Sequence, residues 1–212
     1  MRQSFAGSDV LKIPNLQQAE ALLEEAKILN PGLWINHSIY VAKAAKLISE
    51  RCPDMDDTVA YILGLLHDIG RRTGEMGMRH VIEGYVFLME KGFEDAARIC
   101  MTHTFSYKDI QAIYGEWNCS AEELTIIDNY LNEVDYDDYD LLIQLCDSLV
   151  LPFGFSILEK RFVETALKYG TNNFTVSKWK AVIEVKKYFE GKIGCSIYGL
   201  LPNIMKNTFE EL

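Results

Sequence analysis

The stretch that most constrains the fold is residues 60–72, AYILGLLHDIGRR. It begins as an apolar run with helical spacing and ends in the adjacent polar pair His67 and Asp68, followed by Gly70 and two arginines. Polar side chains at the end of a buried helix cost free energy unless another group pairs with them. A metal ion is the economical partner for an imidazole beside a carboxylate. The remaining question is whether the rest of the chain supplies further ligands.

The rest of the chain also has helical periodicity, and no segment shows the convincing alternation of a strand. Helices are predicted over 15–29, 36–51, 78–91, 94–104, 120–133, 156–170 and 176–190. Two further helices are predicted: the third of the chain starts near residue 56 and carries the opening stretch, and another holds residues 142–147 and ends before Pro152. Short polar residues at 56–58 can cap the third helix, and capping boxes at 120–123 and 156–159 open two later ones. All five prolines fall between these helices, which supports the boundaries. We predict one all-α domain over 1–212.

The charge of the chain limits its partners. The 212 residues carry a formal net charge of −10, so we expect no nucleic acid polymer and no membrane, because both recruit basic patches. A small anionic substrate is compatible, since a bound metal and a few arginines can reverse the potential locally. Five scattered cysteines without C-x-x-C spacing predict reduced thiols. Without an apolar signal segment or an apolar run of about 18 residues, the expected location is cytoplasmic.

All four histidines of the chain and two acids fall on the inward faces of the predicted helices. The six residues are His37, His67, Asp68, His80, His103 and Asp147. A mixed set of imidazoles and carboxylates suits Zn, Mn, Fe, Co or Ni better than Ca, which prefers oxygen ligands alone.

The order His37, His67, Asp68 and Asp147 resembles the HD-domain superfamily of metal-dependent phosphohydrolases. The resemblance includes the apolar lead-in LGLLHDIG and the helix-borne aspartate in LLIQLCDSLV. It implies an HD-domain helical bundle over 34–152, with one metal held by these four residues. Residues 153–212 would then form a C-terminal helical extension.

The two remaining histidines extend the resemblance. His80 and His103 lie between the His-Asp pair and the final aspartate, where HD proteins with two metals carry an extra pair of histidines. The resemblance therefore implies that Asp68 bridges two ions and that His80 and His103 bind the second one. The implied cofactors are one or two divalent ions per chain, drawn from Fe, Mn, Co, Ni and Zn.

The resemblance also implies a reaction. A metal-dependent phosphohydrolase would cleave a small phosphorylated compound, such as a nucleotide or dinucleotide, through metal-bound hydroxide. Asp68 would position or deprotonate the water. The candidates for binding the phosphate are Arg71, one helical turn after Asp68, its neighbour Arg72, and Lys108 in the aromatic segment 105–119.

Several alternatives stay open. Some HD proteins with the same six ligands hold a di-iron site and use O₂ to cleave C–C or C–P bonds, and a degenerate member would be a non-catalytic nucleotide sensor. His80 and His103 could contact the substrate of a one-metal site. Arg71 and Arg72 could be cations at a helix C-terminus, Lys108 could be a solvated loop residue, and Glu75 could act as a proton shuttle. The extension could cap the core, border the pocket or form a homodimer face.

Overall fold

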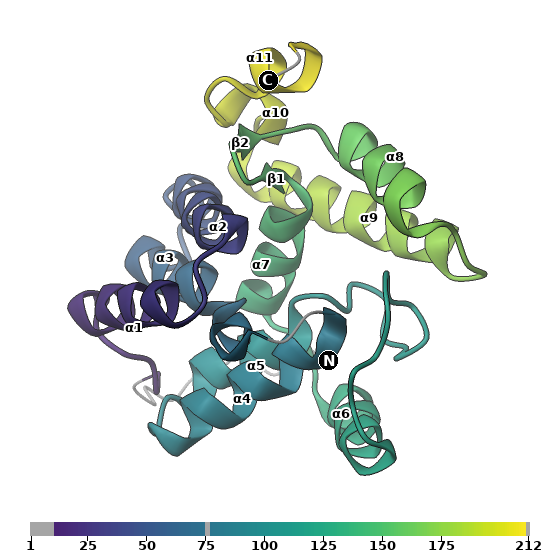
Figure 1. The fold of residues 1–212 in the computed structure, drawn as a ribbon. Helices are drawn as coiled ribbons and strands as arrows, with labels where there is room; N and C mark the ends of the chain where they lie inside the picture. The colour runs from purple at the N-terminus through teal and green to yellow at the C-terminus, as the bar shows by residue number, and fades with distance from the viewer. Residues whose placement is uncertain (1–10, 75–76, 211–212) are drawn as a thin grey trace.

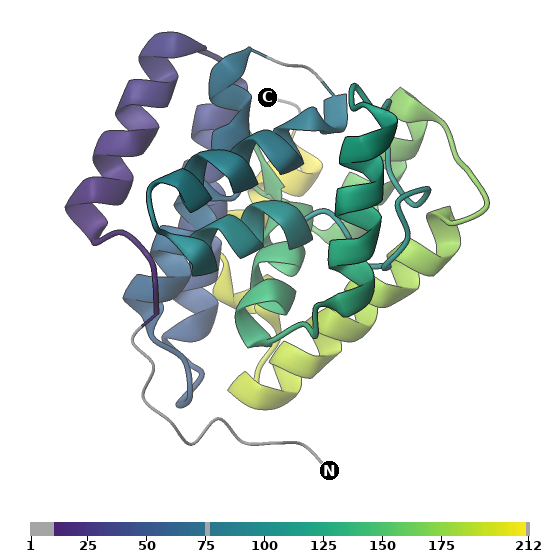
Figure 2. The same ribbon diagram turned by 90° about the horizontal axis from the view of Figure 1, so that it is seen from below.

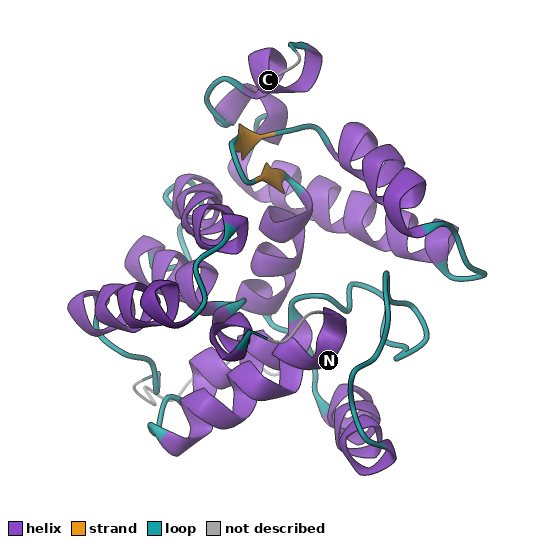
Figure 3. Ribbon diagram, in the orientation of Figure 1, coloured by secondary structure: helices purple, strands orange, loops and turns teal. Residues whose placement is uncertain are grey.

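The structure is a computed structural model that describes residues 11–74 and 77–210. These residues form helices almost throughout, so the predicted all-α class is confirmed (Figure 3). The helices are α1 (Leu16–Leu29), α2 (Leu33–Ser49), α3 (Asp57–Leu66), η1 (Ile69–Thr73), η2 (Gly77–Arg79), α4 (His80–Glu90), α5 (Glu94–Thr102), α6 (Ala121–Glu133), α7 (Asp138–Ser148), α8 (Leu158–Tyr169), α9 (Thr175–Ile193), α10 (Ile197–Leu200) and α11 (Ile204–Phe209).

A short antiparallel hairpin follows α7 and was not expected from the sequence. It pairs β1 (Val150–Leu151) with β2 (Gly154–Phe155). Two residues per strand are too few to produce a recognisable alternation, so the pattern could not show it. The backbone N–H of Ser156 continues this pairing by donating to the Leu149 carbonyl at 2.8 Å.

The hairpin also explains why the capping box predicted at 156–159 is wrong. The N-cap of α8 is Ile157, which makes no side-chain cap bond, because Ser156 is engaged at the end of the hairpin. The box at 120–123 is confirmed, since Ser120 and Glu123 exchange both expected bonds. Asp56 caps α3 through the N–H groups of Thr58 and Val59.

Helix α7 occupies the middle of the molecule. Helices α2, α3, α5 and α9 each pack against it, and Figures 1 and 2 show them arranged around it. Helix α2 begins at Leu33, three residues before the predicted start, so His37 lies in its second turn and not in its first. Helices α2 and α3 approach closely because Gly64 faces the backbone of Ala42. A Cβ at Gly64 would lie 2.7 Å from the Cα of Ala42.

The segment after 152 joins the same core. Helices α8 and α9 stack through the parallel rings of Phe162 and Trp179, whose centroids are 5.2 Å apart. From α9 to α11, Val182, Phe189 and Ile204 are buried in the main apolar cluster. Burial of apolar surface therefore fixes α9 against α7. Among the described helices, none combines the length and the apolar character that crossing a bilayer requires.

Candidate metal centre

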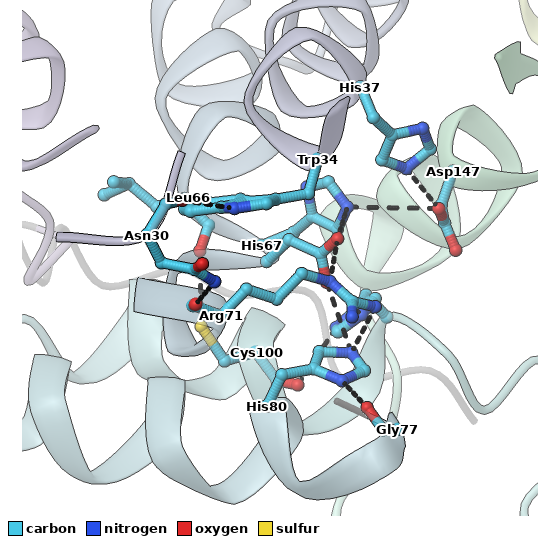
Figure 4. A network of polar contacts seen from close by, with 12 residues as sticks. Asn30, Trp34, His37, Leu66, His67, Arg71, Gly77, His80, Cys100 and Asp147 are labelled. Carbon is cyan, nitrogen blue, oxygen red and sulfur yellow. Dashed lines mark hydrogen bonds and ion pairs between the residues drawn. The ribbon is translucent and has the colours of Figure 1, made fainter. Parts of the chain in front are cut away.

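The structure brings the six candidate ligands together from five helical segments. His37 lies on α2, His67 and Asp68 lie at the junction of α3 and η1, and His80 is the first residue of α4. His103 caps the C-terminus of α5, and Asp147 lies in the last turn of α7. Figure 4 shows His37 and Asp147 on one side of His67, and Arg71 and His80 on the other.

Four of these residues form the first half of the cluster. His37 Nε2 lies 2.8 Å from Asp147 Oδ1, and His67 Nε2 lies 3.9 Å from the same oxygen. His67 Nε2 also lies 3.8 Å from Asp68 Oδ2. Candidate ligand atoms of His37, His67 and Asp68 all fall within 4.8 Å of one another, a spacing that one ion can occupy.

The second half of the cluster shares Asp68 with the first. Asp68 Oδ1 lies 3.2 Å from His80 Nε2 and 3.6 Å from His103 Nε2. These three residues also place candidate ligand atoms within 4.8 Å of one another. Because one carboxylate belongs to both groups, its two oxygens can serve two neighbouring ions.

Three of the imidazoles are oriented by backbone carbonyls. Their Nδ1 atoms face the carbonyl three residues earlier: Gly64 for His67 at 2.7 Å, Gly77 for His80 at 2.7 Å and Cys100 for His103 at 3.0 Å. A carbonyl only accepts hydrogen bonds, so Nδ1 carries the proton and Nε2 presents its lone pair to the cluster. This arrangement is typical of metal-binding histidines.

The family model for the HD domain matches residues 34–150, a span that contains all six residues. The chain belongs to the HD-domain family. This confirms the predicted family, a superfamily of metal-dependent phosphohydrolases. No curated protein and no solved structure shows significant similarity to the chain.

The buried polar atoms of this HD domain fit a bound cation. His67 Nε2 and Asp68 Oδ1 are buried and have no hydrogen-bond partner among the described residues. Since His80 is protonated on Nδ1, its Nε2 and Asp68 Oδ1 are two acceptors only 3.2 Å apart. Two facing acceptors repel each other, and buried acceptors without partners cost free energy. Divalent cations bound at the cluster would remove both penalties, and the mixed N and O donors suit a transition metal.

The charge states of the HD cluster also favour a metal. Burial lowers the pKa of His67 to about 4 and that of His80 to about 3, where Arg71 adds to the effect. Burial alone would raise the pKa of Asp68, but Arg71 and the imidazoles hold it well below its ordinary value. Against the same effect of burial, His37 lowers the pKa of Asp147. At neutral pH His67 and His80 are therefore neutral imidazoles, and Asp68 and Asp147 are ionised carboxylates. These are the forms that bind metals.

These pKa shifts predict a pH dependence for the metal-free HD domain. Unfolded histidine titrates near 6.5, whereas folded His67 titrates near 4, so the unfolded chain binds more protons between these values. The free energy of unfolding is therefore highest above about pH 6.5 and decreases as the pH falls towards 4. Because the pKa values of Asp68 and Asp147 are lowered, their protonation decreases the free energy of unfolding further only below about pH 4.

Thermal unfolding of chelator-treated protein between pH 7 and 4 measures this dependence. His67→Asn removes the titrating group and is the matched comparison, so its unfolding temperature should change less over the same range. Equal slopes for the two proteins would contradict the assignment to His67.

Two of the predicted phosphate-binding cations occupy different places. Arg71 Nε donates to Asp68 Oδ2 at 2.7 Å, so Arg71 lies at the cluster. Lys108 instead donates to the Val134 carbonyl and lies over the Tyr136 ring. No contact of Lys108 with the six cluster residues occurs in the described part of the chain. The position of Lys108 shortly after His103 in the sequence does not reveal the direction of its side chain, so its phosphate-binding role stays a prediction.

Arg72, the residue after Arg71, also makes its contacts away from the cluster. Arg72 Nη2 lies 3.2 Å from Glu25, and its guanidinium lies 4.2 Å from the centre of the Phe87 ring. Arg72 therefore joins α1 to α4 and does not reach the cluster. Glu75 lies outside the described residues.

A chain of hydrogen bonds that the sequence did not suggest supports Arg71. Trp34 Nε1 donates to the Asn30 carbonyl at 2.9 Å, and Asn30 Nδ2 donates to the Arg71 carbonyl at 2.6 Å (Figure 4). The connection between α1 and α2 thus holds the η1 turn in place. No local sequence pattern indicates this hydrogen bond, because Asn30 and Arg71 are 41 residues apart.

Proposed function

We propose that this protein is a metal-dependent phosphohydrolase whose six clustered residues hold one or two divalent ions. The observation that carries the proposal is the position of Arg71. Its guanidinium binds one oxygen of Asp68, the carboxylate common to both halves of the cluster, and its side chain stays 29% exposed. A cation that reaches solvent beside a cluster of anionic and neutral ligands is well placed to bind a phosphoryl oxygen.

The roles of the residues follow from their contacts. Divalent ions bound here would acidify water and neutralise charge that develops on phosphoryl oxygens. Asp68 supplies the negative charge at the centre, and Arg71 holds its Oδ2 so that Oδ1 faces His80 and His103. The Nη1 group of Arg71 has no protein partner among the described residues. Its N–H groups can donate to the substrate, and the planar fork fixes the direction of that contact.

The proposed substrate is a small anionic phosphorylated compound, of which nucleotides and dinucleotides are the preferred class. The net charge of −10 supports a small molecule over a polymer, because repulsion by the rest of the surface grows with the number of phosphates approaching it. We further propose that no membrane takes part and that the protein acts in the cytoplasm.

Metal content and two assays test the proposal. Protein purified without added metal or chelator is analysed for metal per chain, then assayed for phosphate release from nucleotides and dinucleotides and for substrate-dependent oxygen uptake. Phosphate release that stops on chelation and returns with metal supports a phosphohydrolase. Two irons with oxygen uptake and no hydrolysis would replace it with an oxygenase. Nucleotide binding that survives metal removal, without turnover in either assay, would indicate a sensor.

Arg71→Ala tests the proposed phosphate contact. We expect kcat/KM for the best hydrolysed substrate to fall about 10- to 100-fold, the loss expected for one hydrogen bond to a charged group. Metal content should remain that of the wild-type protein, because Arg71 is not a ligand.

Arg72→Ala is the matched control for this experiment. Arg72 contacts Glu25 and Phe87, so its removal should lower stability slightly and leave kcat/KM unchanged. Full kcat/KM in Arg71→Ala, with metal retained, would reduce Arg71 to an electrostatic partner of Asp68.

A further inference from the structure

Helix α9, in the C-terminal extension, carries a half-buried lysine that the proposed site does not yet use. Lys178 Nζ donates to the Ala112 carbonyl at 3.2 Å and lies 4.7 Å from the centre of the Tyr114 ring. Within residues 11–74 and 77–210, it forms no ion pair with a carboxylate. One carbonyl accepts one of its three N–H groups, so two remain to be satisfied.

The position of Lys178 connects it to the metal centre. Helix α9 packs against α7, the helix of Asp147 (Figure 1). Burial lowers the pKa of Lys178 to about 8, and the Asp147 carboxylate is the charge that opposes this shift. Asp147 contacts the histidines only through Oδ1 (Figure 4), and its side chain is 29% exposed. Its second oxygen thus remains open towards neighbouring groups.

The charge of the same carboxylate affects two cations from different parts of the fold. Asp147 acts on the charge of Arg71, on η1, as well as on that of Lys178, on α9. The Tyr169 hydroxyl, at the end of α8, also acts on Arg71. Groups on α8 and α9 therefore interact electrostatically with the charged residues around Asp147.

Lys178 is held in this position by its neighbours. Trp179 Nε1 donates to the Tyr114 hydroxyl at 2.9 Å, and Asn172 Nδ2 donates to the Ile113 carbonyl at 3.2 Å. These bonds attach the beginning of α9 to the segment that follows α5. An ammonium held in place by such contacts loses less rotamer entropy on binding an anion than a free surface lysine does.

We propose that Lys178 binds a phosphoryl group of the substrate beside the metal centre, so that α8 and α9 form one wall of the substrate site. This inference rests on the proposed phosphohydrolase function. It assigns the segment after 152 a direct part in substrate binding. Lys178 and Arg71 lie on separate elements, α9 and η1, and we expect a substrate with two linked phosphoryl groups to contact both.

Binding of inorganic pyrophosphate to the metal-containing protein tests the proposal by titration calorimetry. Lys178→Met removes the charge and keeps the length of the side chain, and its Kd should rise about tenfold or more. Lys180→Met is the matched control, because Lys180 is exposed and two positions further along the same helix, on the opposite side. Its Kd should equal that of the wild-type protein. Metal content is measured before and after each titration.

A second measurement uses the wild-type protein and does not depend on activity. Lys178 should react with acetic anhydride in the free protein, and pyrophosphate should protect it while Lys180 stays reactive, as read by mass spectrometry. Unchanged Kd in folded Lys178→Met, or unchanged labelling of Lys178 with pyrophosphate bound, would overturn the proposal.

The two proposals fail in different ways. Hydrolysis of phosphorylated compounds without any effect of Lys178 on pyrophosphate binding would remove the inference and leave the function. Pyrophosphate binding that depends on Lys178, in a protein that hydrolyses no phosphorylated compound, would remove the function and leave the binding site.

Discussion

Asp68→Asn is expected to eliminate metal binding at both halves of the cluster. The Asp68 carboxylate is the only acidic group shared by the two sets of candidate ligands identified in the described residues. Asparagine keeps the shape of the side chain but removes the negative charge that the ions and Arg71 require. We expect no metal to copurify with this variant, and turnover to fall by at least about 10³-fold with the loss of metal-based charge stabilisation.

His103→Ala separates the two halves of the cluster and is the matched variant. His103 belongs only to the second set of candidate ligands, with its Nε2 3.6 Å from Asp68 Oδ1, so its removal should release one ion and leave the ion near His37. Metal analysis of the purified proteins gives both results. Metal retained at wild-type stoichiometry in Asp68→Asn would contradict the bridging role, and retention of two ions in His103→Ala would contradict a second site.

Gly70→Ala is expected to have the largest effect on stability. A Cβ at this position would lie 2.0 Å from the His80 carbonyl oxygen and 2.5 Å from the Gly84 backbone nitrogen. Both are backbone atoms, so η1 and α4 must separate to admit a methyl group. We expect a loss of about 3 kcal/mol, the upper part of the range for overpacked cores. In a protein of this size the unfolding temperature should fall by about 6 to 12 °C.

The same displacement should disturb the site, because His80 is the residue that η1 contacts at Gly70. Loss of metal affinity should therefore accompany the loss of stability. Gly191→Ala is the matched control, since Gly191 lies within α9 and a Cβ there would meet no atom within 4 Å. Alanine should stabilise that helix by about 0.5 to 1 kcal/mol. An unfolding temperature for Gly70→Ala equal to that of wild type would contradict the close packing of η1 on α4.

The sequence alone identified the helices and the members of the cluster. Helical periodicity, the Asp56 cap and the Ser120 box depend on residues within one or two turns of each other, so local patterns are sufficient to find them. The histidines and aspartates were recognisable because each occupies the inward face of its own helix. Their order along the chain then matched the HD pattern, which the family comparison confirmed.

Local patterns do not show the contacts that a side chain or backbone group forms with distant partners. Ser156 had the sequence of a capping box, but its backbone pairs with Leu149 across the hairpin. Lys108 followed His103 closely in sequence, yet its ammonium binds the Val134 carbonyl, 26 residues away. In each case a contact made possible only by the folded chain outweighed the local preference.

The sequence by itself therefore determined the all-α class, the HD family and the residues that meet at the cluster. The tertiary structure decided how they meet. His37 Nε2 lies 2.8 Å from Asp147, 110 residues further along the chain. The absence of a side chain at Gly70 allows close contact with the backbone of His80, and α9 packs against α7, the helix of Asp147. Residue type and helical face are local properties, so a sequence records them directly. Distances between segments are set by the packing of the whole core, in which small side chains and close backbone contacts decide which groups can touch.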